Sequence, residues 1–510
     1  MSANHTSANL GERTVRAVGW RATSQLISQF FSWIIAIAIA RLLGPTAYGL
    51  IGMITVFTGF AMLFGGLGLG EAIIQRKNLE KQHLDTAFWL NFFVGLSMTL
   101  AMIALAPLIA WFFSEPRLRW LTSVMAIRFL LDALNVVQRA LLRREMRFRA
   151  LAGVEITSAV VGGIIGLTMA FYGLGVRSLV AQSVGCSLMQ LLLCWRVTSW
   201  RPSCSFSRQA SKELFGFSLF VLGFNVVNYW GRNADNLLVG RFLGPRSLGI
   251  YSRAYSLMLL PLSQISWVVA AVMIPALCSI QDDIARVKRS YLKAISILGL
   301  ITFPITVGSF ITSEHLIPGL LGNQWVGVIP IFKILCVVGL LQSITTTIGW
   351  IYQSQGRTAL QFKMGLIISI CCVIAFAIGI HWGVLGVAWS YCVLCLIVWY
   401  PNWAVCGSII GLSFSDMVKV LVPPFACAVG MGGIVWAIEN ALPSTMPHWL
   451  HLSIEVPSGV LIYLFVVASA KLEASRQAWL ALGQVLGDRL PRMRRLLLNY
   501  ALVKPRVHSR

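Results

Sequence analysis

The sequence predicts an all-α protein that crosses a membrane many times. Of its 510 residues, 57% are hydrophobic and only 12% are charged. Apolar runs such as 26–40, 96–113 and 366–380 approach the length needed to cross about 30 Å of hydrocarbon, and runs of this kind recur along the whole chain. Helices are expected because a spanning segment must satisfy its own backbone hydrogen bonds.

We expect about fourteen transmembrane helices joined by short loops. The predicted spans are 21–41, 46–68, 86–113, 118–139, 150–172, 177–197, 214–240, 247–277, 291–313, 327–353, 362–380, 384–408, 417–438 and 449–470. The longest loop expected on the outer side is roughly 313–325, which leaves no room for an external catalytic domain.

The basic residues predict the orientation of these spans. The net charge is +23, and in a soluble protein that would suggest nucleic acid. Here Lys and Arg gather in alternate loops, and the loop between the fourth and fifth spans holds Arg143, Arg144, Arg147 and Arg149. Because basic loops stay in the cytoplasm and contact anionic lipid, both termini are expected to be cytoplasmic. Membrane lipid, and not nucleic acid, is the expected partner.

The motif Arg-x-Leu-Gly-Pro-x-x-x-Gly occurs twice, at 41–49 and at 241–249. Gly closes a helix and Pro cannot continue one, which explains each copy alone but not the shared Arg, Leu and final Gly. The motif therefore predicts two related halves, and an even number of helices in each makes them parallel repeats. We expect a six-helix lobe at 1–200, a second at 201–410, an extra helix pair at 411–470 and a basic cytoplasmic tail at 471–510.

Polar residues follow one face of three predicted spans. On the seventh they are Asn225, Asn228, Arg232, Asp235 and Asn236, spaced so that they share a stripe in which Arg232 and Asp235 can pair. On the first span, Gln25 is in register with Asn225. On the fourth they are Arg128, Asp132, Asn135 and Arg139, and Arg253 begins the eighth span.

Two interpretations of these residues remain open. Polar side chains at helix contacts often only hold a bundle together, and we favour that role for isolated groups such as Glu155. Each intramembrane charge costs about 2.5–3.5 kcal/mol, so the Arg-bearing stripes are expected to face a water-filled cavity. Arg binds phosphate through planar, charge-assisted hydrogen bonds. The stripes therefore predict a substrate with a phosphate or another anionic group.

We expect no metal and no cofactor from the sequence. His448 and His451 could share a helical face, but we expect no third ligand nearby. The 11 cysteines lie almost all inside apolar segments, where they act as small hydrophobic residues.

Part of the chain resembles a known family. The stretch 232–245 reads Arg-Asn-Ala-Asp-Asn-Leu-Leu-Val-Gly-Arg-Phe-Leu-Gly-Pro, and 248–255 reads Leu-Gly-Ile-Tyr-Ser-Arg-Ala-Tyr. Together with 40–49 they resemble the Wzx-type polysaccharide flippases, near the colanic and teichuronic acid exporter branch. These belong to the multidrug/oligosaccharidyl-lipid/polysaccharide (MOP) exporter superfamily. With the helix pattern, the resemblance covers nearly the whole chain.

The resemblance implies a V-shaped, MATE-like bundle in the bacterial inner membrane. It implies transport of an undecaprenyl-diphosphate-linked oligosaccharide from the cytoplasmic to the periplasmic leaflet by alternating access. The product would be an exopolysaccharide, a capsule or an O-antigen. Coupling to protons or sodium is implied for the family, and a polysaccharide polymerase and a chain-length regulator are candidate partners. By position, Arg232, Asp235, Arg128 and Asp132 would be the charged residues of the lumen.

The predicted function is therefore a lipid-linked oligosaccharide flippase, not an enzyme. In this prediction the arginines attract the diphosphate, and Asn225, Asn228, Gln25 and Asn135 bind sugar hydroxyls. A multidrug antiporter of the same superfamily is an alternative, although a cation substrate requires an acidic or apolar pocket. A membrane glycosyltransferase or polymerase is a further alternative that the short outer loops disfavour.

Overall fold

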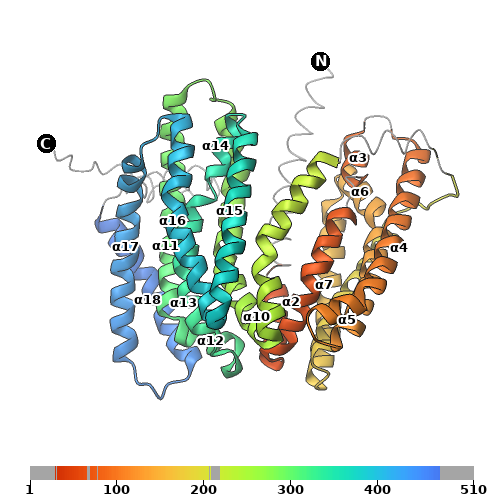
Figure 1. The fold of residues 1–510 in the computed structure, drawn as a ribbon, viewed down its shortest axis with the longest axis horizontal. Coiled ribbons are helices and arrows are strands. Elements are labelled where there is room, and N and C mark those ends of the chain that lie inside the picture. Colours follow the sequence, from red (N-terminus) through yellow and green to blue (C-terminus); the bar gives the residue numbers. More distant parts are fainter. Residues whose placement is uncertain are drawn as a thin grey trace. The chain divides into compact units, whose positions relative to one another are not determined.

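In the computed structural model, the described residues are 29, 31–65, 69–76, 79–205, 207 and 219–470. Their regular elements are α-helices and two short 3-10 helices. The chain divides into two compact units, Met1–Gly249 and Ile250–Arg510 (Figure 1). The lobe boundaries expected from the sequence, at residues 200 and 410, stay a prediction.

The first unit contains a short apolar helix followed by seven complete helices and the beginning of a long one. In order they are Phe31–Leu42, α2 (Pro45–Gly65), α3 (Leu69–Gln75), α4 (Lys81–Phe112), α5 (Arg117–Ala133), α6 (Val136–Arg144), α7 (Phe148–Phe171), α8 (Val176–Val197) and α10 (Leu219–Cys278) as far as Gly249.

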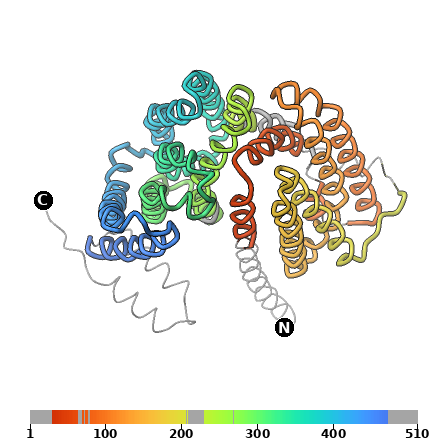
Figure 2. Tube along the Cα trace, turned by 90° about the horizontal axis from the view of Figure 1, so that it is seen from below, coloured from red at the N-terminus to blue at the C-terminus, as the bar shows by residue number. Residues whose placement is uncertain are grey.

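The second unit contains the rest of α10 and the remaining elements. They are α11 (Ile284–Ile311), α12 (Ser313–Leu321), η1 (Asn323–Trp325), α13 (Val328–Thr345), α14 (Ile348–Ser354), α15 (Thr358–Gly379), η2 (Ile380–Trp382), α16 (Gly383–Ile410), α17 (Phe414–Ala441) and α18 (His448–Ser469). Viewed along the helices, α17 and α18 lie side by side in blue at the edge of this unit (Figure 2).

The expectation of an all-helical protein with many spans is confirmed. Within the described residues, ten helices are long and apolar enough to cross a membrane, or eleven if the bent pair in α10 is one span. One of these ten segments, Thr358–Ile410, contains both α15 and α16. The total of fourteen transmembrane helices stays a prediction.

Both copies of the repeated motif interrupt a helix, as the Gly-Pro pair predicts. The first helix ends at Leu42 and α2 begins at Pro45. In the second copy, Gly244 breaks α10 with φ 79° and ψ 178°. That backbone conformation is open essentially to glycine alone. The φ of Gly44 is not positive, so the two copies turn differently despite their shared sequence.

Glycines allow α7 and α8 of the first unit to pack closely. On α7, a Cβ added to Gly162 would lie 2.8 Å from Cβ of Cys186, and one added to Gly166 would lie 2.8 Å from Cβ of Gln182. Both partners belong to α8. Small residues at such contacts let backbones approach, which drives helix association where lipid removes the hydrophobic effect.

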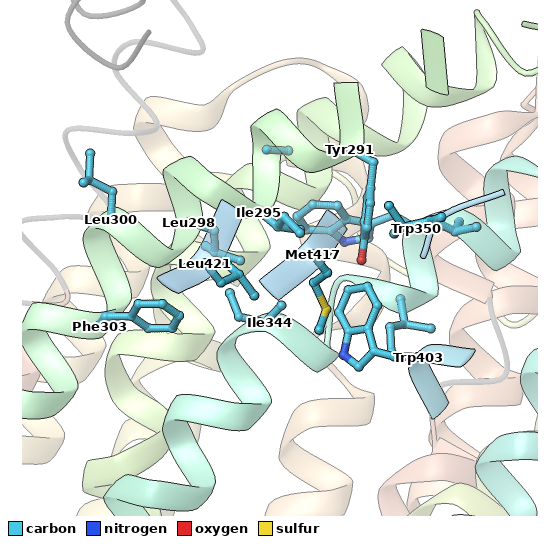
Figure 3. Packing of buried hydrophobic residues seen from close by; sticks show 14 of the residues in the cluster. Tyr291, Ile295, Leu298, Leu300, Phe303, Ile344, Trp350, Trp403, Met417 and Leu421 are labelled. Carbon is cyan, nitrogen blue, oxygen red and sulfur yellow. The ribbon is translucent and has the colours of Figure 1, made fainter. Parts of the chain in front are cut away.

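The core of the second unit lies between α11, α13, α14, α16 and α17. Figure 3 shows Tyr291 of α11 on the side of Trp403 of α16 and Met417 of α17, and Leu298 of α11 beside Leu421 of α17. The Tyr291 hydroxyl is 2.7 Å from Oγ1 of Thr347, so the polar atom of this buried ring has a partner. Tightly packed aromatic residues fix the relative positions of these helices.

Candidate functional site

Arg128 lies at the centre of a small polar group in the first unit. Its Nε donates to Oδ2 of Asp132, one turn later on α5, at 3.3 Å, and its Nη1 donates to Oγ of Ser183 on α8 at 2.9 Å. The side chains of Arg128 and Asp132 are 42% and 32% exposed. The Arg is thus held by two partners and still presents donors to its surroundings, which suits an anionic ligand.

The fourth span expected at 118–139 lies within one apolar segment, Arg117–Arg144, but its helix has a local break. The helix α5 ends at Ala133 and α6 begins at Val136. The carbonyl of Leu134 accepts a hydrogen bond from the indole Nε1 of Trp195 on α8 at 3.2 Å. A side chain that takes a carbonyl from the helical ladder is a known cause of such breaks.

Asn135 lies at this break. Asn135 occupies the N-cap position of α6 without a side-chain cap hydrogen bond. It is 2% exposed, and its Oδ1 has no hydrogen-bond partner among the described residues. Farther along α6, Nη2 of Arg139 lies 3.8 Å from Oε1 of Glu155 on α7. Glu155 therefore joins two helices, in agreement with the structural role favoured from the sequence.

The stripe of the seventh predicted span lies on α10, and its charges are separated. Arg232 is exposed, whereas Asp235 is 3% exposed and accepts a hydrogen bond from the backbone N–H of Asn236 at 2.7 Å. Within the part of the chain that the structure describes, no ion pair joins Arg232 to Asp235. The expected pairing is therefore wrong. The Oδ1 of Asn236 is buried without a described partner.

Three of the sequence-predicted residues fall outside the described side chains. Gln25 precedes the described residues, and Asn225 and Asn228 lie in the described backbone of α10, where their side chains are not described. Their proposed contacts with sugar stay predictions.

Arg253 belongs to the second unit and has an aromatic partner. Its guanidinium carbon lies 5.6 Å from the ring centre of Trp325, which is fully buried in η1. A cation over an indole face is attracted by the ring quadrupole. This contact supports a role in joining α10 to η1.

Sequence reasoning missed two groups that position these helices. Ser183 looks like any serine in an apolar helix, and nothing in its neighbourhood marks it as a partner of Arg128. Tyr229 donates from its hydroxyl to the carbonyl oxygen of Val56 on α2 at 2.7 Å. It precedes Arg232 by one helical turn, so its spacing along the polar stripe could have revealed it.

Comparison with known proteins identifies the family of this chain. A family described as polysaccharide biosynthesis protein matches residues 38–330, more than half of the chain. The chain belongs to this family. It is a multi-pass membrane transporter of polysaccharide biosynthesis, of the Wzx type within the MOP superfamily, and not an enzyme. The resemblance expected from residues 232–255 is thereby confirmed.

Two curated relatives match most of the chain. It is 27% identical over 418 residues to the teichuronic acid biosynthesis protein TuaB of Bacillus subtilis, covering 81% of this chain and 86% of the relative. It is 26% identical over 422 residues to the lipopolysaccharide biosynthesis protein WzxC of Escherichia coli, covering 82% and 86%.

Solved structures show the same fold. The lipid II flippase MurJ in an inward closed conformation superposes with a TM-score of 0.70 at 14% identity, covering 88% of this chain and 98% of that one. An inward-facing multidrug resistance MATE transporter of the MOP superfamily superposes with a TM-score of 0.56 at 17% identity, covering 75% and 96%. The chain thus has a MurJ/MATE-like fold.

Proposed function

We propose that this transporter flips undecaprenyl-diphosphate-linked oligosaccharide repeat units across the bacterial inner membrane. Transport runs from the cytoplasmic to the periplasmic leaflet by alternating access and supplies an exopolysaccharide, a capsule or an O-antigen. The observation that carries the proposal is the family match combined with a fold shared over 98% of a lipid II flippase. Lipid II flippase and Wzx-type relatives are named for lipid-linked or polysaccharide cargo.

The described charges fit an anionic headgroup. Arg128 is held by Asp132 and Ser183, and Arg232 is exposed on α10 without a described ion-pair partner. In the proposed mechanism these two arginines attract the diphosphate or an acidic sugar, because a guanidinium binds phosphate with two parallel hydrogen bonds. Asp132 holds Arg128 in place, and Asp235 and Asn236 complete the polar face of α10.

Fourteen spans follow if the breaks at Gly244 and at η2 each separate two crossings, while α5 with α6 and α13 with α14 each make one. Gly244 divides α10, η2 divides α15 from α16, and Phe31–Leu42 is the end of the first span. With both termini cytoplasmic, residues 1–200 and 201–410 form the two lobes, followed by the helix pair at 411–470 and the tail at 471–510. Fusing a reporter that is active only in the periplasm after Glu439 should give activity, and fusing it after Arg149 should give none.

The transport experiment uses the full chain in liposomes that carry a lipid-linked oligosaccharide. We expect the sugar to become accessible to an added glycosidase on the opposite leaflet only when the protein is present. Arg232→Ala should slow this by about tenfold or more, the loss that one charge-assisted bond explains. Arg246→Ala removes an exposed Arg from the same helix and is the control. Equal rates in the two variants would contradict the role of Arg232.

The same liposomes separate the rival functions. A multidrug antiporter would move a fluorescent cation and leave the lipid-linked sugar in place, and a glycosyltransferase or polymerase would form a new glycosidic bond. Imposing a proton or a sodium gradient in turn identifies the coupling ion. Copurification with a polysaccharide polymerase or a chain-length regulator tests the proposed partners.

A further inference from the structure

Three elements of the second unit meet at a cluster of His and Glu side chains. His315 lies on the short helix α12, Glu439 lies near the end of α17, and His451 and Glu455 lie in the first turns of α18. Nε2 of His315 is 3.5 Å from Oε1 of Glu439 and 3.9 Å from Oε1 of Glu455. Nδ1 of His451 is 3.5 Å from the same oxygen of Glu455.

The cluster buries polar atoms that make no hydrogen bond with the described residues. Glu455 is 1% exposed and His451 is 2% exposed. Both carboxylate oxygens of Glu455 and both ring nitrogens of His451 are buried without a hydrogen bond from the described residues. A buried polar group left in this state costs about 1–3 kcal/mol, and more when it is charged. Four such atoms close together indicate a site for a group that accepts lone pairs, such as a cation.

We propose that His315, His451 and Glu455 bind one divalent transition-metal ion with the chemistry of zinc. Their ligand atoms all lie within 4.8 Å of one another. Zinc takes His nitrogen and carboxylate oxygen at about 2.0–2.2 Å in a tetrahedron, which places neighbouring ligand atoms roughly 3.3–3.5 Å apart. The two nitrogen ligands exclude a calcium or magnesium site, since these ions prefer oxygen. Glu439 supplies the fourth ligand beside His315.

Binding the ion requires the ligand side chains to rearrange. The rings of His315 and His451 are stacked, with centroids 4.0 Å apart and planes at 8° to each other. Lone pairs in parallel planes do not converge on one point, so one ring must tilt for both nitrogens to reach the ion. Bringing ligand atoms that lie up to 4.8 Å apart to the tetrahedral spacing requires them to close by up to roughly 1.4 Å.

A further histidine prepares His315 for this role. Nδ1 of His315 lies 3.1 Å from Nδ1 of His448, and one of the two donates. When His315 donates from Nδ1, its Nε2 carries the lone pair that faces Glu455 and Glu439, the usual arrangement around a metal-binding imidazole.

The ion would connect segments that are far apart in the sequence. It would tie α12 to the final helix pair, α17 and α18, at one end of the second unit. Glu455 also lines a cavity of about 310 Å³ whose walls come from α11, α12, α17 and α18.

The test uses the full-length protein without a polyhistidine tag, stripped with a chelator and then titrated with Zn²⁺. We expect one zinc ion per chain by elemental analysis, a rise in the unfolding temperature, and no such rise with Mg²⁺. Co²⁺ should give the intense visible absorption of a four-coordinate site. A wild-type protein that takes up no zinc, or gives no four-coordinate cobalt spectrum, would overturn the proposal.

Variants locate the ion. His451→Ala and the nearly isosteric Glu455→Gln should each weaken zinc binding by at least about tenfold. His381→Ala removes an exposed histidine of η2 and should bind zinc as the wild type does. If His451→Ala does not fold, Glu455→Gln decides the location alone. Undiminished binding by Glu455→Gln would overturn the assignment.

Discussion

Gly49 and Gly249 each lie against the other copy of the repeated motif. A Cβ on Gly49 would overlap the carbonyl oxygen of Pro245, and a Cβ on Gly249 would overlap the carbonyl oxygen of Pro45. The final glycine of each copy is therefore the point at which α2 and α10 come closest. The two copies of the motif therefore contact each other, with the final glycine of each copy packed against the proline of the other.

This contact predicts that Gly49→Ala destabilises the protein. The added methyl group has no room beside a backbone carbonyl, so the helices must separate, at a cost of about 1–3 kcal/mol. Gly153→Ala is the matched control, because a Cβ there meets nothing within 4 Å and Ala favours a helix. Unfolding temperatures of the purified variants should drop for the first and hold or rise for the second. A drop of the same size in both would contradict the reciprocal contact.

The two motif copies should differ in their response to alanine at the earlier glycine. Gly244 has φ 79° and ψ 178°, which an alanine adopts at a cost of about 1–3 kcal/mol. Gly44 has no positive φ and no atom within 4 Å of an added Cβ. Gly244→Ala should therefore lower the unfolding temperature more than Gly44→Ala. Two equal shifts would mean that the copies turn alike.

Tyr229→Phe tests the hydrogen bond between α10 and α2. The hydroxyl donates to the carbonyl of Val56 at 2.7 Å, and its loss should cost about 0.5–1.5 kcal/mol. Phe keeps the ring contact with Trp230, so the change isolates the hydroxyl. The matched control is Tyr172→Phe, which removes the hydroxyl of an exposed tyrosine and should leave the unfolding temperature unchanged. Equal effects at the two positions would argue against the interhelical bond.

Arg128→Ala should reduce transport more than it reduces stability. The guanidinium is partly exposed, so its loss removes a ligand donor and leaves Asp132 able to reach water. Export of polymer at matched protein level should fall by about tenfold or more, and Ser183→Ala should give a smaller loss. Arg119→Ala, an exposed Arg on the same helix, is the control. Wild-type export by Arg128→Ala would remove this residue from the site.

Sequence patterns were reliable wherever the physical cause was local. Apolar runs had to become spanning helices, because no other backbone satisfies itself in lipid. The Gly-Pro pairs had to interrupt helices, and they do so before Pro45 and at Gly244. The stretch 232–255 also carried enough family-specific residues to identify a polysaccharide transporter, which the match over 38–330 confirms.

Side-chain partners could not be predicted in the same way. The sequence placed Arg232 and Asp235 one turn apart, yet Arg232 is exposed while Asp235 is buried. It placed Asn135 on one stripe with Arg128, but Trp195 from another helix binds the carbonyl at which the stripe breaks. Spacing along one helix says nothing of which neighbours compete for its polar atoms.

The sequence by itself determined that this chain is a helical membrane transporter with an internal repeat, and which family it belongs to. Only the tertiary structure decided that Gly49 meets Pro245, that Ser183 holds Arg128, and that His315 joins His451 and Glu455. The physical reason is the distance along the chain over which each effect acts. Hydropathy and helix-breaking act over a few residues, whereas a ligand cluster depends on how helices more than a hundred residues apart pack and rotate against one another.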